Sequence, residues 1–170
     1  MRAFSVFAAF SITLILFFTD ARAAEPKWKK YPNERFGFVL TYPSELIGGP
    51  LPENGGGREF HSADGEFSVL ANGHFLLVDD GDSIEKHWKD ELKEDGGTVT
   101  YKKKTASWYV VSGVTKNGVE YYVKFFVKGS NWAEFRITYP HAKNKKYDPW
   151  AAQIEKAFVP FRDGDFDRLK

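Results

Sequence analysis

The chain contains no cysteine among its 170 residues. This absence excludes disulfide bonds, thiolate metal sites, a cysteine nucleophile and a lipid anchor on an N-terminal cysteine. Asn-x-Ser/Thr acceptor sites for glycans are missing as well. Packing therefore has to hold the fold together, and aromatic residues, 17% of the chain, suit this because each buried ring removes a large apolar area from water.

An excess of charge of one sign is also lacking. The chain has 24 basic and 23 acidic residues, and without residues 1–23, which hold Arg2, Asp20 and Arg22, its formal charge is zero. A neutral chain gives no electrostatic reason to expect nucleic acid or an anionic membrane as a partner.

The N-terminus has the pattern of a secretory signal peptide. Arg2 precedes an apolar run over 3–18, and the small residues at 21 and 23 match a cleavage site. A permanent membrane anchor is the alternative, but the run is shorter than the roughly 20 residues that a spanning helix needs. We expect cleavage after Ala23 and a periplasmic or secreted protein, with one domain over 24–162 and a polar tail over 163–170.

Apolar alternation predicts most of the secondary structure. A short polar lead covers 25–30, and residues 44–58 form an irregular loop rich in Gly and Pro. Asn72-Gly73 indicates a bend or bulge, and Asn117-Gly118 a tight hairpin turn. Period-two patterns predict strands over 36–42, 59–61, 67–77, 108–114, 119–128 and 132–139, with extended chain also from Thr98 and a turn over 63–66.

Two helices are expected. The first has Asp82 as its N-cap, buries Ile84, Trp88 and Leu92, and ends at Gly96-Gly97. The second is capped by Asp148, starts at Pro149 and ends before Pro160. The strand over 119–128 is apolar on both faces, which indicates cover on both sides. The predicted fold is α+β, a largely antiparallel sheet flanked by helices.

One segment combines several groups that could bind a ligand. Glu59 and His61 project from the same face of a short strand, Asp64 follows in the next turn, and Arg58 precedes them. We name Arg58, Glu59, His61 and Asp64 as candidate binding residues. The last three would suit a cation or a polar ligand, and the guanidinium of Arg58 would suit an anion. The plain alternative is that these side chains face water or pair with one another.

Other motifs carry weaker hypotheses. The glycine-rich segment 54–58 is either an anion cradle or a flexible connection, since it matches no phosphate-binding spacing. His87 and Glu91 lie one helical turn apart without the second histidine of a zinc site, which favours a surface pair. The acidic run 79–82 reads as a capping turn rather than a calcium loop. The lysines at 102–104 suit an edge strand; other lysines stand at 143, 145 and 146.

Three segments carry a family resemblance. The sequences FGFVLTYP at 36–43, NGGGREFHSADG at 54–65 and FRITYP at 135–140 resemble those of small exported bacterial proteins related to the PsbP/Mog-like α/β/α sandwich. The resemblance spans most of residues 31–160. It implies that fold and an accessory or binding role rather than an enzymatic one.

No Gly-x-Ser-x-Gly elbow occurs, and Ser112-Gly113 lies in mid-strand. We therefore expect an exported, non-catalytic binding or accessory domain without a cofactor, whose partner is another exported protein or a small ligand. Two alternatives stay open. One is a metal-dependent hydrolase built on Glu59, His61 and Asp64, and the other is a secreted inhibitor or effector that presents the glycine-rich loop.

Overall fold

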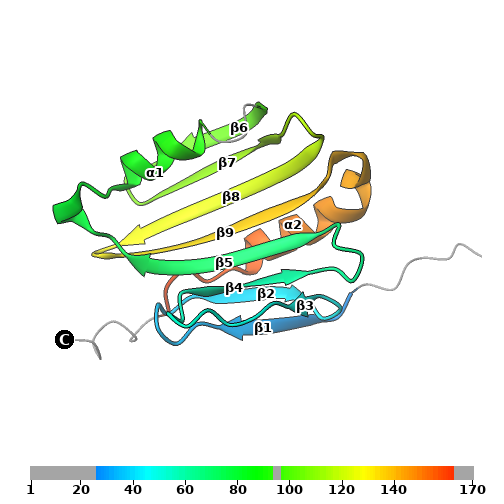
Figure 1. Ribbon diagram of the computed structural model, residues 1–170, viewed down its shortest axis with the longest axis horizontal. Helices are drawn as coiled ribbons and strands as arrows, with labels where there is room; N and C mark the ends of the chain where they lie inside the picture. The colour runs from blue at the N-terminus through cyan, green and yellow to red at the C-terminus, as the bar shows by residue number, and fades with distance from the viewer. Residues whose placement is uncertain (1–25, 94–96, 163–170) are drawn as a thin grey trace, which may run out of the picture.

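The computed structural model describes residues 26–93 and 97–162 (Figure 1). The expected signal peptide, Gly96 and the polar tail lie outside the described residues. The strands are β1 Trp28–Pro32, β2 Val39–Pro43, β3 Ile47–Gly48, β4 Gly57–His61, β5 Ser68–Phe75, β6 Thr98–Lys104, β7 Trp108–Val114, β8 Val119–Lys128 and β9 Asn131–Pro140. The helices are α1 Ile84–Glu91 and α2 Asn144–Ala157, with two short 3-10 helices, η1 Val78–Asp80 and η3 His141–Lys143.

An antiparallel sheet of seven strands dominates the fold, in the order β3-β4-β5-β9-β8-β7-β6, and β1 pairs with β2 in a separate ribbon. The predicted α+β class is therefore confirmed. The bounds of β7 and β8 agree with the sequence prediction, β9 is one residue longer at each end, and β6 forms the sheet edge as its lysines suggested. Within the described residues, no helix is long and apolar enough to cross a membrane.

The sheet separates two hydrophobic clusters. The larger lies between the sheet, α2 and the β1–β2 ribbon, and includes Phe38, Phe67, Phe135 and Ile154, each at most 1% exposed. The smaller lies on the opposite face under α1, around Tyr109, Val111, Tyr121, Val123 and Phe125. Residues of β8 contribute to both clusters, which confirms that this central strand is covered on both faces.

The ribbon strand β1 was missed in the sequence, where it reads as part of a polar lead. Its two lysines are exposed, but Trp28 and Tyr31 pack against the larger cluster. All five of its residues pair with β2. A strand with only two inward side chains gives a weak periodic signal, so the partner strand rather than local pattern defines it.

The first helix begins one residue later than predicted. Ser83, not Asp82, is the N-cap, and its hydroxyl accepts a hydrogen bond from the backbone N–H of Lys86 at 3.2 Å. Asp82 instead accepts from the N–H of Leu77. The helix ends at Glu91, short of the predicted glycine stop. Its apolar stripe at 84, 88 and 92 packs on the smaller cluster as expected.

The second helix begins five residues earlier than predicted, so Pro149 lies inside it. Tyr147 explains the difference, because its fully buried ring packs against Phe67 and Tyr139 and draws the first turn onto the core. The side chain of Asp148, the predicted cap, accepts a hydrogen bond from the Tyr139 hydroxyl at 2.8 Å instead. Burial of one aromatic ring thus outweighs the local start signal of Asp-Pro.

The predicted bulge at Asn72-Gly73 is wrong, since the register between β5 and β9 is continuous there. Gly73 is needed for a different reason. A Cβ atom at this position would lie 2.7 Å from Cβ of Phe36 and 3.1 Å from the carbonyl oxygen of Trp132. The glycine therefore allows the chain before β2 to lie directly on the sheet.

An ion pair fastens α1 to the sheet. Arg136 on β9 donates a hydrogen bond from Nη2 to Oε2 of Glu91 at 2.6 Å, and Glu91 is only 7% exposed. A carboxylate taken out of water needs such a partner to remain ionised without a large penalty.

We expect Gly73→Ala to lower the free energy of unfolding by about 2 kcal/mol, because the new methyl group overpacks the contact with Phe36. Urea denaturation followed by tryptophan fluorescence measures this change. Gly49→Ala is the matched control, since its Cβ would meet the carbonyl of Glu59 at an ordinary 3.5 Å. Equal stabilities of the two variants would contradict the close approach.

Arg136→Ala should destabilise the domain by about 3 kcal/mol, because it leaves the buried Glu91 carboxylate without this partner. The double variant Glu91→Leu/Arg136→Met should recover most of that loss, since no buried charge then remains. Both values come from the same urea titration. If the double variant were as unstable as the single one, the pair would have a packing role rather than an electrostatic one.

Candidate functional site

Helix α1 covers only part of its face of the sheet. Under the helix, Val123 and Phe125 of β8 are fully buried. On the same face further along the sheet, Leu70 and Asn72 of β5 and Glu134 of β9 are only partly buried. In Figure 1, α1 lies beside β7 at one side of the sheet, away from β4 and β5. The part of this face over β4, β5 and β9 is therefore accessible to a ligand.

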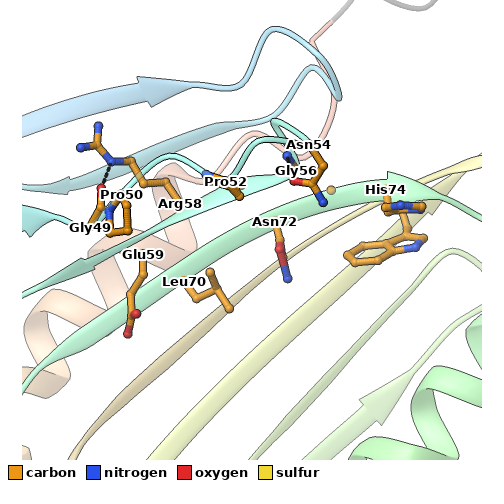
Figure 2. A pocket seen from close by; sticks show the side chains of 13 residues that line it. Gly49, Pro50, Pro52, Asn54, Gly56, Arg58, Glu59, Leu70, Asn72 and His74 are labelled. Carbon is orange, nitrogen blue, oxygen red and sulfur yellow. Dashed lines mark hydrogen bonds between the residues drawn. The ribbon is translucent and has the colours of Figure 1, made fainter.

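A cavity of about 380 Å³ lies at this uncovered part (Figure 2). One wall is the loop between β3 and β4, which contributes Pro50, Pro52 and Asn54. The other residues come from the sheet, and those used below are Glu59 from β4, Leu70, Asn72 and His74 from β5, and Trp132 from β9. We call this cavity the sheet groove.

Arg58 and Glu59 both line the groove, but their side chains point in opposite directions (Figure 2). Arg58 Nε donates to the carbonyl oxygen of Gly49 at 2.8 Å, and its guanidinium lies 5.4 Å from the centre of the Phe60 ring. Arg58 therefore ties β4 to the loop. Glu59 lies on the accessible face and accepts a hydrogen bond from the Ser68 hydroxyl.

The other two predicted binding residues lie elsewhere. His61 Nδ1 is 3.1 Å from the carbonyl oxygen of Ser62, and His61 does not line the sheet groove. Asp64 lines a separate hollow, where the hydrogen bond from the Ser62 hydroxyl lowers the pKa of its carboxyl group. Strand alternation thus does place Glu59 and His61 on one face, but the structure does not bring Asp64 to the same cavity as Glu59.

No group of three or more His, Asp or Glu side chains suited to a metal ion occurs within 26–93 and 97–162. Glu59, His61 and Asp64, the residues of the hydrolase alternative, therefore do not form such a group. His87, interpreted above as a surface partner of Glu91, instead stacks on Phe125 at 4.5 Å between ring centroids, with Nε2 2.9 Å from Oδ1 of Asp82.

The glycine-rich segment is held in place by its own hydrogen bonds. The N–H of Gly55 donates to the carbonyl of Pro52, and the N–H of Gly56 donates to Oδ1 of Asn54, both at 2.9 Å. Asn33 Nδ2 donates to the carbonyl of Gly55 at 2.9 Å. An anion cradle needs N–H groups that point to the ligand, and these two are already used inside the loop. The segment is therefore an anchored wall of the sheet groove.

Aromatic rings form one end of the groove. His74 stacks on Phe36 with ring centroids 5.9 Å apart and lies 6.1 Å from Trp132, which in turn contacts Phe125 at 5.2 Å. Trp132 is held rigidly by these contacts and yet only partly buried. A rigid, amphipathic ring of this kind can contact a ligand with little loss of side-chain entropy.

A second hollow of about 270 Å³ adjoins the groove along β9, between the sheet and α1. Glu134 links the two, because it lines this hollow and its Oε1 accepts a hydrogen bond from Asn72 Nδ2 at 3.0 Å. Asp90, Glu91 and Arg136 line it as well. Glu91 is buried and paired with Arg136, and Asp90 is paired with Lys86. Glu59 is exposed and accepts its hydrogen bond from a neutral hydroxyl, so its carboxylate favours a ligand that carries positive charge.

The candidate site residues named from the sequence do not include Asn72, His74, Trp132 or Pro50. Each stands in a segment whose local pattern indicates a strand or a loop, and they meet only because β5 pairs with β9 and the loop folds over β4. The pairing of His74 with Trp132 in the β5–β9 register is a long-range fact with no local signal. An alternating strand predicts which face a side chain takes, not which strand stands beside it.

No family model and no curated protein matches this chain. Among solved structures, it is similar to the cyanobacterial PsbP (CyanoP) of Synechocystis sp. PCC 6803, with a TM-score of 0.57 and 10% sequence identity over 82% of this chain and 96% of that chain. A protein of Bacteroides thetaiotaomicron has 15% identity over 82% of this chain and 50% of its own, with a TM-score of 0.49, which is too low to support an argument. The predicted resemblance is confirmed at the level of the fold, and this chain has a PsbP-like fold.

Proposed function

We propose that this protein is an exported, non-catalytic binding domain that holds a basic and partly apolar segment of another exported protein in the sheet groove. The observation that carries the proposal is the incomplete cover of the sheet face, which leaves a walled groove of about 380 Å³. The PsbP-like fold supports a binding role by analogy alone, because a fold can host many functions.

The chemistry of the groove decides the kind of ligand. Pro50, Pro52, Leu70 and Trp132 offer apolar surface, and Glu59 is an exposed carboxylate on the same accessible face. An apolar site with a few placed polar groups is the usual form of a binding pocket. A partner segment with a lysine or arginine next to apolar residues would match both the carboxylate and the apolar surface of the groove. Its basic side chain would pair with Glu59, and its apolar residues would pack on the ring of Trp132.

A protein segment fits better than a compact metabolite. The groove and the hollow beside α1 follow one another on the same sheet face, because Asn72 of the groove donates a hydrogen bond to Glu134 of the hollow, and a ligand that used both would be elongated. Extended peptides use such surfaces, with alternate side chains entering successive hollows. Export is proposed from the N-terminal pattern over 1–23, and the partner would then be met outside the cytoplasm.

In-cell crosslinking of the tagged mature protein, followed by mass spectrometry of co-purified proteins, tests the proposal. We expect one stoichiometric exported partner, crosslinked at residues around the groove. Glu59→Lys and Trp132→Ala should each lower recovery of that partner about tenfold, because each removes one of the two recognition elements. Capture of many unrelated proteins, or of none, would overturn the proposal.

Glu53→Lys serves as the matched control for Glu59→Lys. Glu53 carries the same charge and lies exposed in the loop that forms the groove wall, but it does not line the cavity. The control should retain the partner at physiological salt, where exposed charges more than about 8 Å apart are largely screened. Equal losses in both variants would show that only net charge matters, which would contradict a specific groove.

A further inference from the structure

Trp150 separates two hollows that lie apart from the sheet groove. The first, about 470 Å³, is lined by Pro26, Trp28, Pro149, Trp150 and Gln153. The second, about 290 Å³, also includes Trp150, together with Glu45, Asp64 and Lys146. None of these residues lines the groove. A side chain shared by two neighbouring hollows can contact a ligand on both sides.

The indole of Trp150 is held in a fixed position. Its ring meets the ring of Phe67 edge-on at 5.2 Å and that of Tyr147 at 5.4 Å, and both of these rings are fully buried. Trp150 itself is only partly buried. The core therefore fixes one part of the indole and leaves another part to line the hollows, which is the arrangement of a rigid stacking platform.

The first hollow has aromatic and proline walls with one amide. Trp28 from β1 lies on it as well as Trp150, and Gln153 supplies a carbonyl oxygen and an NH₂ group. Among the described residues, no acceptor is paired with the indole N–H of Trp28 or of Trp150. The volume of this first hollow falls within the range of roughly 300–1,000 Å³ that is typical of small-molecule sites.

The second hollow offers both signs of charge on exposed side chains, Lys146 and Asp64, each of which has a hydrogen-bond partner. Lys146 Nζ donates to the hydroxyl of Tyr147 at 2.8 Å, and this hydrogen bond raises the pKa of Lys146. Asp64 is oriented by the Ser62 hydroxyl and by the N–H of Glu66 at 3.1 Å. Donor and acceptor groups thus stand beside one aromatic wall, without an excess of positive charge that would select an anion.

We propose that the two hollows around Trp150 form a binding site for a neutral carbohydrate chain. A pyranose ring has an apolar C–H face and a rim of hydroxyl groups that both donate and accept hydrogen bonds. The C–H face would stack on the indole of Trp150, and the hydroxyl groups would meet Asp64, Lys146 and Gln153. A second sugar unit would contact Trp28.

Other classes of ligand match fewer of the groups that line the two hollows. An anionic ligand such as a nucleotide would meet the carboxylates of Glu45 and Asp64 as well as Lys146. A proline-rich peptide could use the Trp and Pro walls, but it would make no contact with Asp64 and Lys146 of the second hollow. A neutral sugar satisfies the apolar walls and both charged groups together.

Titration of the mature protein with chitotetraose and with cellotetraose, followed by NMR of the indole N–H resonances, tests this site. We expect saturable shifts of the Trp28 and Trp150 resonances with at least one of the two sugars. Absence of shifts with both at millimolar concentration would overturn the proposal, and so would saturation by a proline-rich peptide alone. Shifts confined to Trp132 would place the sugar in the sheet groove and likewise overturn it.

Substitutions test which side chains contribute to sugar binding. Trp150→Ala should weaken sugar binding about tenfold or more, because it removes the stacking surface. Since Trp150 also packs on the core, Asp64→Asn and Gln153→Ala provide tests at exposed positions, each with an expected loss of several-fold. Trp108→Phe is the control, since Trp108 is a partly buried tryptophan on β7 that lines neither hollow. Unchanged affinity in both Asp64→Asn and Gln153→Ala would contradict the assigned contacts.

Discussion

The pairing of β5 with β9 is the constraint on which the rest of the structure depends. It runs without interruption from Ser68 opposite Thr138 to Phe75 opposite Asn131. This pairing joins a meander of β3, β4 and β5 to a second meander of β6 to β9. The residues that pair between β5 and β9 are more than fifty positions apart in the chain. It builds the floor of the larger core on one face and the floor of the sheet groove on the other.

This constraint also explains how far the sequence predicts the structure. Local signals suffice for the hairpins from β7 to β9, where Asn117-Gly118 sets a tight turn and period-two alternation sets the strand bounds. They fail for β1 and for the start of α2, where burial of Trp28 and Tyr147 against distant residues overrides the polar lead and the Asp-Pro start signal. Where partners lie far apart in the chain, tertiary packing decides.

In the candidate site, too, local alternation predicts some features, and others depend on contacts between distant parts of the chain. Alternation correctly assigns Glu59 and His61 to one face, and it also implies that Arg58 points to the other, as found. The role of the glycine-rich segment depends on hydrogen bonds with Asn33, Pro52 and Gly73, which cannot be read from spacing. The segment is thus a fixed wall because polar groups from three parts of the chain hold it, although its composition alone is typical of a flexible loop.

The size of α1 accounts for the accessible face. A helix about 10 Å in diameter covers about two of the roughly 4.8 Å spacings between strands, whereas seven strands span six such spacings. One helix of eight residues therefore cannot cover the whole face, so residues such as Leu70, Asn72 and Glu134 must be compatible with water. Their neighbours Val69 and Phe135 are fully buried on the opposite face. Because that opposite face contains the larger core, substitutions on the groove side change the lining of the sheet groove with little loss of folding stability.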